Sequence, residues 1–192
     1  DGVIFAISIY FLACLHFAGT VGLSVLDIST GDFLIAEGDI EYTAKLLDNF
    51  SPNEVLITKE NKKHFVNSYG DSFNLFFLDE WVFNLDYAND LLKKQFETSS
   101  LKGFGIDDLN NGIISSSAIM HYLNETQHER LNHITSIKRI PKEGHVWLDR
   151  FTIRNLELFR PNSVEGKCLI DIIDRTLSPM GGRLLKRWVA LP

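Results

Sequence analysis

The 192-residue sequence predicts a mixed α/β domain, a sheet with flanking helices, followed by a smaller helical segment. Three apolar runs joined by short turns open the chain, and they predict an antiparallel meander. Helical and strand patterns then alternate, which favours some parallel pairing. The charge balance also changes, because residues 1–137 carry 8 Lys and Arg against 19 Asp and Glu, whereas residues 138–192 carry 11 against 6. Two units with different surroundings are therefore expected.

The opening runs are rich in β-branched and aromatic residues, which favour strands. Strands are expected at residues 10–17, 21–26 and 33–36, with turns between them. No Lys, Arg, Asp or Glu occurs from residue 2 to residue 26, and a stretch of this length could cross a bilayer. It has no basic residue ahead of it and is interrupted by glycines and polar residues. Buried strands are therefore preferred to a signal peptide or a membrane helix.

Beyond residue 38 the apolar residues take a helical spacing, and helices then alternate with strands. The expected elements are a helix at 42–50, a strand at 54–58, a helix at 59–69, a strand at 73–78, and helices at 85–96 and at 112–122 continuing toward 126. A flexible, Gly-containing joint is expected at 101–105. The small residues at 115–118 favour close packing of the last of these helices on the sheet.

Periodicity is lost at residues 127–147, which contain a Pro and a Gly, so a boundary is expected there. The predicted division is a domain at 1–130, a linker at 131–148 and the first helices of a second domain at 149–192.

The second domain is expected to begin with a helix capped by Asp149, followed by a short apolar helix or turn at 168–173. Ser178 and Pro179 suit the N-cap and the first position of the last helix. The apolar stripe of that helix is expected to be buried, and it comprises Met180, Leu184, Leu185, Trp188 and Leu191.

The chain has only two cysteines, Cys14 and Cys168, and each lies in an apolar run. A disulfide framework needs more cysteines, and a metal site needs closer spacing. Both are therefore predicted to be buried free thiols in a reducing compartment.

The strongest motif lies at the C-terminal end. Residues 149–158, Asp-Arg-Phe-Thr-Ile-Arg-Asn-Leu-Glu-Leu, resemble the helix that opens the core domain of bacterial MutS DNA mismatch repair proteins. Residues 168–192 resemble the family signature Leu-x-x-x-Ile/Leu-Asp-Arg-Thr-x-Thr-x-Met-Gly-x-Arg-Leu-Leu-x-x-Trp-x-x-x-Pro. Weaker similarity extends upstream through residues 26–33, 101–105 and 122–127. A match of this length in fixed order is far more specific than a short motif.

The resemblance implies that residues 1–130 are the family's connector domain, which is ribonuclease H-like, and that 149–192 begin the core or lever domain. Matching residues with an expected structural role are Arg154, Asp174, Arg175, Thr176, Met180, Gly181, Arg183, Leu185, Trp188 and Pro192.

The resemblance also implies a module that relays ATP- and mismatch-dependent conformational change and offers a surface to MutL. Catalytic, cofactor and metal residues are not expected in this piece, because it has neither a phosphate-binding Gly-x-x-x-x-Gly-Lys-Ser/Thr loop nor a mismatch-probing Phe-x-Glu element. The whole protein is expected to bind ATP with Mg²⁺ and mismatched duplex DNA, to form a homodimer, and to work in the cytoplasm at the nucleoid without a membrane.

Two other hypotheses stay open. A ribonuclease H-like nuclease or resolvase would need clustered carboxylates for two metal ions, and Asp27, Asp32 and Glu37 are candidates, although Asp is also favoured at turns. A MutS paralogue without repair activity would share these motifs. His121, Glu125 and His128 fall on one helix face, for which a solvated surface is the preferred interpretation. The apolar stretch at 2–9 is either an extra strand or a junction.

Overall fold

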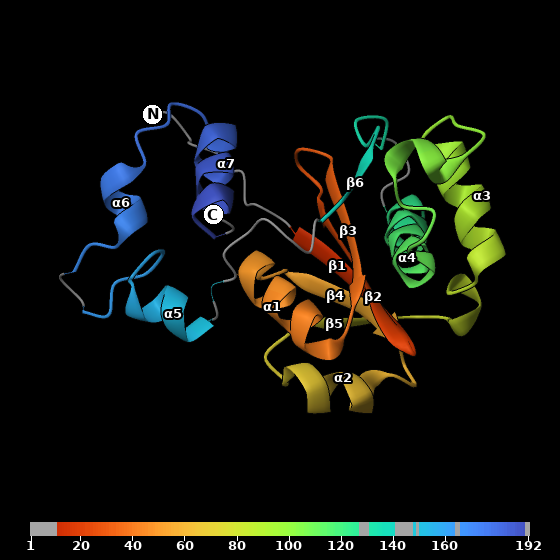
Figure 1. Ribbon diagram of the computed structural model, residues 1–192, viewed down its shortest axis with the longest axis horizontal. Coiled ribbons are helices and arrows are strands. Elements are labelled where there is room, and N and C mark those ends of the chain that lie inside the picture. The colour runs from red at the N-terminus through yellow and green to blue at the C-terminus, as the bar shows by residue number, and fades with distance from the viewer. Residues whose placement is uncertain (1–10, 127–130, 141–147, 149, 164–165, 191–192) are drawn as a thin grey trace. The chain divides into compact units, whose positions relative to one another are not determined.

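Figure 1 shows a computed structural model of the chain, which describes residues 11–126, 131–140, 148, 150–163 and 166–190. The chain divides into two compact units. An α/β unit comprises residues 9–44 and 50–141, and a helical unit takes in residues 142–192.

The α/β unit is built on a six-stranded sheet with the order β5-β4-β1-β2-β3-β6. The strands are β1 (Phe11–Ala18), β2 (Thr20–Asp27), β3 (Asp32–Gly38), β4 (Glu54–Thr58), β5 (Leu75–Leu78) and β6 (Ile137–Arg139). The first three form the predicted antiparallel meander. β4 is parallel to β1, β5 is parallel to β4, and β6 is parallel to β3. The sheet is therefore mixed, as the alternation of helices and strands predicted.

Helices and 3-10 turns connect the strands. They are α1 (Ile40–Phe50), α2 (Lys62–Tyr69), η1 (Glu80–Val82), α3 (Leu85–Gln95), η2 (Leu101–Phe104) and α4 (Asn110–Thr126). Most of these bounds agree with the sequence prediction within a few residues. The start of α3 shows why, since the side chain of Asn84 accepts hydrogen bonds from the backbone N–H groups of Asp86 and Tyr87 at 3.0 and 3.1 Å. This is the N-cap chemistry that ends a loop and begins a helix.

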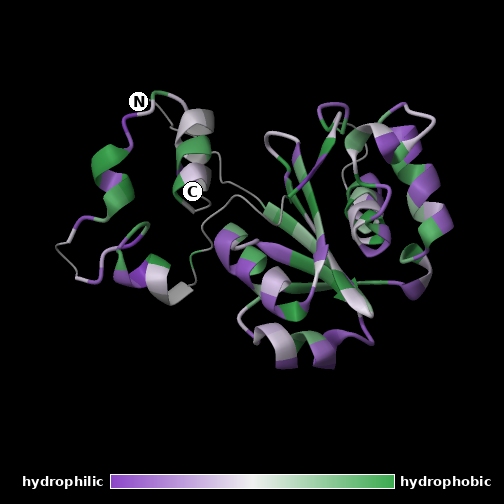
Figure 2. Ribbon diagram, viewed as in Figure 1, coloured by the Kyte–Doolittle hydropathy of each residue, from purple (hydrophilic) through white to green (hydrophobic). Residues whose placement is uncertain are grey.

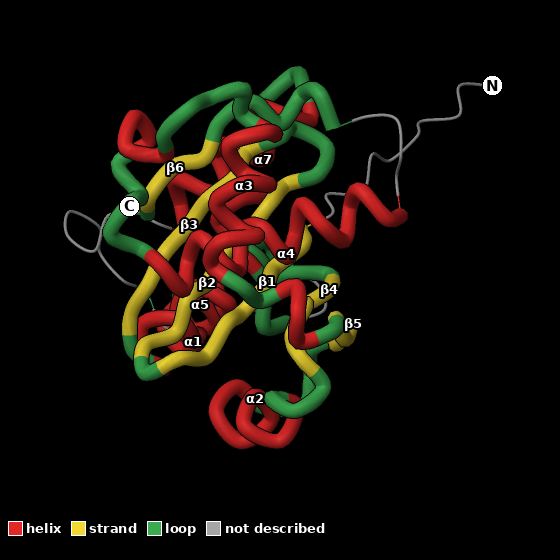
Figure 3. Tube along the Cα trace, turned by 90° about the vertical axis from the view of Figure 1, so that its right-hand side faces the viewer, coloured by secondary structure: helices red, strands yellow, loops and turns green. Residues whose placement is uncertain are grey.

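The core lies on both faces of the sheet, which explains the near-continuous apolar runs of the strands. Leu12, Cys14 and Leu26 point to one face, where residues of α3 and α4 cover them. Their sequence neighbours Ala13 and Val25 point to the opposite face and are also buried. Figure 2 shows hydrophobic residues along the strands and mixed character on α3, and Figure 3 views the face that α3 and α4 cover.

α4 approaches the sheet unusually closely. Its side chains from Asn111 to Met120 are buried, including Ser115, Ser116 and Ser117. The expectation that small residues at 115–118 allow close packing is therefore confirmed. The closest approach is at Gly22 of β2, where an added Cβ would lie 2.1 Å from the carbonyl carbon of Asn111.

Two parts of the α/β unit differ from the sequence prediction. Residues 101–105 are not a flexible joint, because Leu101 is buried and the segment forms the 3-10 turn η2, which ends at Gly105 in a left-handed conformation. β6 lies within residues 131–148, which were expected to be a linker. Its three residues are too few to show a strand period, and only their pairing with β3 makes them a strand.

The helical unit contains α5 (Arg150–Asn155), α6 (Leu169–Ile173) and α7 (Pro179–Ala190). The backbone N–H groups of Leu169 and Ile170 donate to the carbonyl oxygens of Glu157 and Leu158 at 2.8 and 3.0 Å, which ties α6 to the segment after α5. Ser178 caps α7 as predicted, because its Oγ accepts a hydrogen bond from the N–H of Gly181 at 3.1 Å.

The predicted burial of the α7 stripe is wrong for two of its members. Leu184 is 44% exposed and Trp188 is 63% exposed. An amphipathic pattern identifies the face of a helix that favours burial, but the described part of the helical unit has too few elements to cover it. Leu185 is half-buried. The side chains of Met180 and Leu191, the predicted cap Asp149 and the apolar stretch 2–9 lie outside the described residues.

We predict that Gly22→Ala destabilises the α/β unit by about 3 kcal/mol, because the added methyl group would meet backbone atoms of α4 that cannot rotate away. Urea unfolding followed by circular dichroism measures the loss. Gly103→Ala is the matched control, because a Cβ there meets nothing within 4 Å, and a change within about 0.5 kcal/mol is expected. Equal stability of Gly22→Ala and the unsubstituted chain would contradict the close approach.

Candidate functional site

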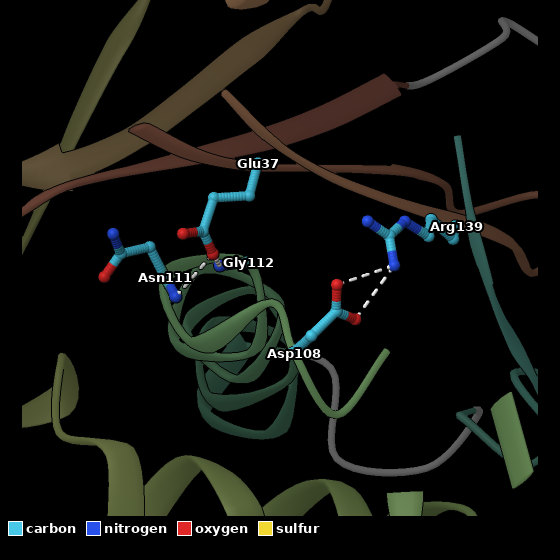
Figure 4. A network of polar contacts seen from close by, with 5 residues as sticks. All are labelled: Glu37, Asp108, Asn111, Gly112 and Arg139. Carbon is cyan, nitrogen blue, oxygen red and sulfur yellow. Dashed lines mark hydrogen bonds and ion pairs between the residues drawn. The ribbon is translucent and has the colours of Figure 1, made fainter. Parts of the chain in front are cut away.

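Polar side chains gather where the first turn of α4 meets the meander (Figure 4). One carboxylate oxygen of Glu37, on β3, accepts hydrogen bonds from the backbone N–H groups of Asn111 and Gly112 at 2.9 and 3.3 Å. The other accepts from the hydroxyl of Thr20 at 2.7 Å. The N–H groups of a first helical turn have no partner within the helix, and a negative charge there is favoured. Glu37 therefore caps α4 from the sheet.

The side chain of Asn111 connects α4 to the β1–β2 turn by hydrogen bonds. Its Nδ2 donates to the backbone oxygens of Ala18 and Thr20 at 3.1 and 3.2 Å, and to the Thr20 hydroxyl at 2.8 Å. Glu37, Thr20 and Asn111 thus form one network that joins two strands and a helix.

A second buried network lies one turn further along α4. The Ser24 hydroxyl of β2 is within hydrogen-bond distance of the hydroxyls of Ser115 and Ser116, at 2.5 and 2.8 Å. The hydroxyls of Ser115 and Ser116 also lie 2.9 Å from the carbonyl oxygen of Gly112. All three serines are fully buried, so these bonds replace lost water. Ser115 and Ser116 therefore join α4 to β2 by hydrogen bonds within the closely packed interface that the small residues at 115–118 predicted.

An ion pair connects β6 to the loop before α4. One guanidinium nitrogen of Arg139, Nη1, donates to both carboxylate oxygens of Asp108 at 2.8 Å, as Figure 4 shows. Both side chains are largely exposed, so the pair contributes little to stability but fixes a geometry.

Two of the three carboxylates that suggested a nuclease, Asp27 and Glu37, accept backbone and side-chain hydrogen bonds. Asp27 accepts from the N–H and hydroxyl of Ser29, which is the turn chemistry weighed against a metal site. Glu37 caps α4, and Glu54 accepts from the hydroxyl of Tyr122 at 3.2 Å. Within the part of the chain that the structure describes, no group of three or more His, Cys, Asp or Glu could hold a metal ion.

Two histidines, His121 and His16, lie against aromatic rings. His121 Nδ1 lies 2.9 Å from the Tyr87 hydroxyl, and its ring contacts that of Trp81. The preferred interpretation of a solvated His121 face was therefore incomplete, because sequence spacing along α4 could not show contacts from α3 and η1. His16 stacks on Phe83, and burial lowers its pKa. His128 and His145 lie outside the described residues.

Three residues of the C-terminal signature shape the loop before α7. Asp174 Oδ1 accepts hydrogen bonds from the N–H and the hydroxyl of Thr176 at 3.0 and 2.7 Å. A Cβ added at Gly181 would lie 3.1 Å from Cβ of Thr176, so a glycine permits the loop to fold against the helix. Gly182, which the sequence analysis did not single out, is similarly close to Thr176 and Asp174.

Three other signature residues, Arg154, Arg175 and Trp188, are exposed in the helical unit. Trp188 lies on the uncovered face of α7. The side chains of Met180 and Arg183, and all of Pro192, lie outside the described residues.

Both cysteines are free and buried, as predicted. Burial raises the pKa of the Cys14 thiol well above its ordinary value. The Cys168 thiol donates to Asp171 Oδ2 at 2.9 Å, and the Cys168 N–H donates to the same oxygen at 3.1 Å. These bonds fix the first turn of α6.

The fold and these contacts define a structural module, in which an α/β body with internally bonded polar groups precedes a helical unit. Residues 3–135 match the family model of MutS domain II, and residues 151–192 match that of MutS domain III. The chain belongs to the MutS family of DNA mismatch repair proteins. No finding supports the alternative of a nuclease.

Similar proteins carry the same name. The chain is 56% identical over 183 residues to the DNA mismatch repair protein MutS of Flavobacterium psychrophilum, covering 95% of this chain and 21% of that protein. It is 53% identical to MutS of Christiangramia forsetii, covering 100% of this chain and 22% of that protein. MutS of Bacteroides fragilis is 48% identical over 183 residues, with 95% and 21% covered. The chain therefore spans about a fifth of the length of these relatives.

Among the helices that the structure describes, none combines the length and the apolar character needed to cross a membrane. The charge-free stretch after residue 10 instead forms β1 and most of β2, which agrees with the preference for buried strands.

We predict that Glu37→Ala destabilises the α/β unit by about 1–2 kcal/mol, because the α4 cap and its favourable charge are lost together. Glu37→Gln should cost less, since an acceptor oxygen is kept. Urea unfolding measures both, and Glu60→Ala on an exposed turn is the control. A Glu37→Ala variant as stable as the control would contradict the capping role.

A pH dependence is expected in the helical unit. Hydrogen bonds from Cys168 lower the pKa of Asp171, and those from Thr176 lower the pKa of Asp174, below the ordinary 3.8. Each ionised carboxylate therefore stabilises the folded unit above pH 3.8, and this contribution is lost as the pH falls through the lowered pKa. We predict that Thr176→Val raises the pKa of Asp174 toward 3.8 and leaves that of Asp171 unchanged, measured by carboxyl carbon chemical shifts. An unmoved Asp174 titration would refute this assignment.

Proposed function

We propose that this chain is the connector module and the first core helices of a mismatch repair protein, and that it relays conformational change. The α/β body moves as a unit relative to the helices that follow it, and it offers a surface to MutL. The observation that carries the proposal is the order of the two family matches, domain II and then domain III, on two separately compact units.

The internal bonding of the α/β unit supports rigid-body motion. Glu37, Asn111 and Ser24 join α4 to the meander through buried or partly buried hydrogen bonds. A body bonded in this way transmits a displacement without deforming, which a relay requires.

The exposed apolar residues of the helical unit support packing against other domains of the full-length protein. Leu156 on the segment after α5, Ile172 on α6 and Trp188 on α7 are all more than half exposed. Apolar side chains exposed on successive helices are typical of surfaces that another element covers.

We further propose that the sheet is ribonuclease H-like but without nuclease activity. An antiparallel meander followed by β4 and β5, parallel and on the far side of β1, supports the assignment of the fold. The hydrogen bonds made by Asp27, Glu37 and Glu54 support a structural use of the carboxylates.

The remaining functions are proposed for the full-length protein by family membership. It would bind mismatched duplex DNA, and ATP with Mg²⁺, through other parts, hydrolyse ATP, and form a homodimer. The acidic balance of residues 1–137 supports this division, because a negative surface repels phosphates. Bacterial relatives and two buried free thiols support a cytoplasmic location.

We predict that the N-terminal domain of MutL from the same organism binds this chain with a dissociation constant in the micromolar range, measured by isothermal titration calorimetry. Lysozyme, a basic protein without a role in repair, is the control for non-specific charge attraction. A dissociation constant of about 200 µM corresponds to a binding free energy of about −5 kcal/mol. If no binding is detected at that concentration, MutL is not a partner of this module.

A further inference from the structure

Five aromatic side chains on four elements of the α/β unit lie in two groups of contacting rings. They come from β5, η1, α3 and α4, and we call them the aromatic strip: Phe76, Trp81, Tyr87, His121 and Tyr122. Ring centroids are 4.8 Å apart for Phe76 and Tyr122, and 5.1 Å apart for Trp81 and His121. The ring centroids of Trp81 and Tyr87 are 5.4 Å apart. His121 immediately precedes Tyr122 on α4. Phe76 and Tyr122 thus form one group and Trp81, Tyr87 and His121 form another, and α4 connects the two groups through the consecutive residues His121 and Tyr122.

The aromatic strip is held in place and faces outward. The 2.9 Å hydrogen bond between the Tyr87 hydroxyl and His121 Nδ1 joins α3 to α4 at its centre. Trp81 is nevertheless 58% exposed and Phe76 is 41% exposed. Ordered Trp and Tyr side chains that remain exposed are typical anchor residues of protein–protein interfaces, because they bury large areas with little loss of entropy.

Carboxylates accompany the aromatic strip. Glu54 accepts from the Tyr122 hydroxyl, Glu80 directly precedes Trp81, and Glu125 lies one turn after His121. The pKa values of Tyr122 and Tyr87 are raised, chiefly by burial and further by the negative charges of Glu54 and Glu125 respectively. The surroundings are thus electronegative, in keeping with the acidic balance of residues 1–137.

A neighbouring ring of β5 already contacts a cation within the unit. On the other face of β5, Lys62 Nζ lies 5.7 Å from the ring centroid of Phe77. The face of an aromatic ring attracts cations, and carboxylates beside it strengthen that attraction. Phosphates would be repelled, so nucleic acid does not fit the aromatic strip.

We propose that the aromatic strip, with Glu54, Glu80 and Glu125, is a docking site for a partner protein that presents arginine or lysine side chains. A cationic side chain would stack on Trp81 while its charge is balanced by the carboxylates. The strip gives shape and area, and the carboxylates select the charge.

The test uses the 192-residue chain and nuclear magnetic resonance. The chain has three tryptophans, Trp81, Trp147 and Trp188, so its indole N–H signals report on the site and supply two internal references. The probe is a glycine-flanked tri-arginine peptide. Its control is the same peptide with citrulline, which keeps the shape of arginine and removes the charge. The Trp81 indole N–H signal is assigned by its disappearance in Trp81→Phe. It should shift when the arginine peptide is added and keep its position when the citrulline peptide is added.

Variants separate the parts of the site. We expect Trp81→Ala to weaken binding about tenfold, followed by the His121 ring signals, and Trp81→Phe to restore part of it. The double variant Glu54→Gln and Glu125→Gln should weaken binding severalfold. Phe77→Ala is the matched control, because Phe77 lies on the same strand, is 38% exposed and already has Lys62 over its ring. It should leave the affinity unchanged, and thermal melting confirms that each variant folds.

Four results would overturn the proposal. The first is an equal shift with the arginine and citrulline peptides. The second is unchanged affinity in Trp81→Ala. The third is displacement of the peptide from Trp81 by duplex DNA. The fourth is self-association of the chain that Trp81→Ala abolishes, which would make a second copy the occupant.

Discussion

The close contact between α4 and the meander is the constraint on which the α/β unit depends. At Gly22 the backbones of β2 and α4 leave no room for a side chain. This approach removes the first turn of α4 from water, so its N–H groups need partners from the protein. The carboxylate of Glu37 on β3 accepts hydrogen bonds from these N–H groups. The side chain of Asn111 donates to the β1–β2 turn, and one turn further along the helix Ser24 bonds to Ser115. The polar residues of this interface therefore follow from the tightness of its packing.

The same interactions account for how the carboxylates of the α/β unit are used. Carboxylates that could hold metal ions if they converged are separated by their structural tasks, Asp27 in a turn, Glu37 at a helix end and Glu54 beside a tyrosine. Each is bonded to a donor within the unit. Hydrogen bonds of this kind hold the parts of the α/β unit together, in keeping with the rigid body that we propose.

The two units expose apolar side chains of different kinds, and this difference indicates different kinds of binding surface. On the α/β unit the exposed rings around Trp81 are ordered by contacts with one another and surrounded by negative charge. On the helical unit, exposed aliphatic residues include Leu177 in the loop before α7 and Ile172 on α6. The first surface resembles a binding site for a separate molecule, and the second resembles the inner face of a larger helical domain.

The sequence by itself determined the meander, the bounds of most helices, the cap of α7 and the family, because each rests on local periodicity, turn chemistry or an ordered motif. It could not show that β6 is a strand, since three residues have no period, nor that residues 101–104 form a 3-10 turn with Leu101 buried. It also gave the wrong burial for Leu184 and Trp188, because an apolar face does not specify what covers it. Only the tertiary structure decided that Glu37 caps α4 and that His121 joins Trp81 and Tyr87. These contacts link residues 34 to 74 positions apart, and such pairings depend on the path of the whole chain rather than on neighbouring residues.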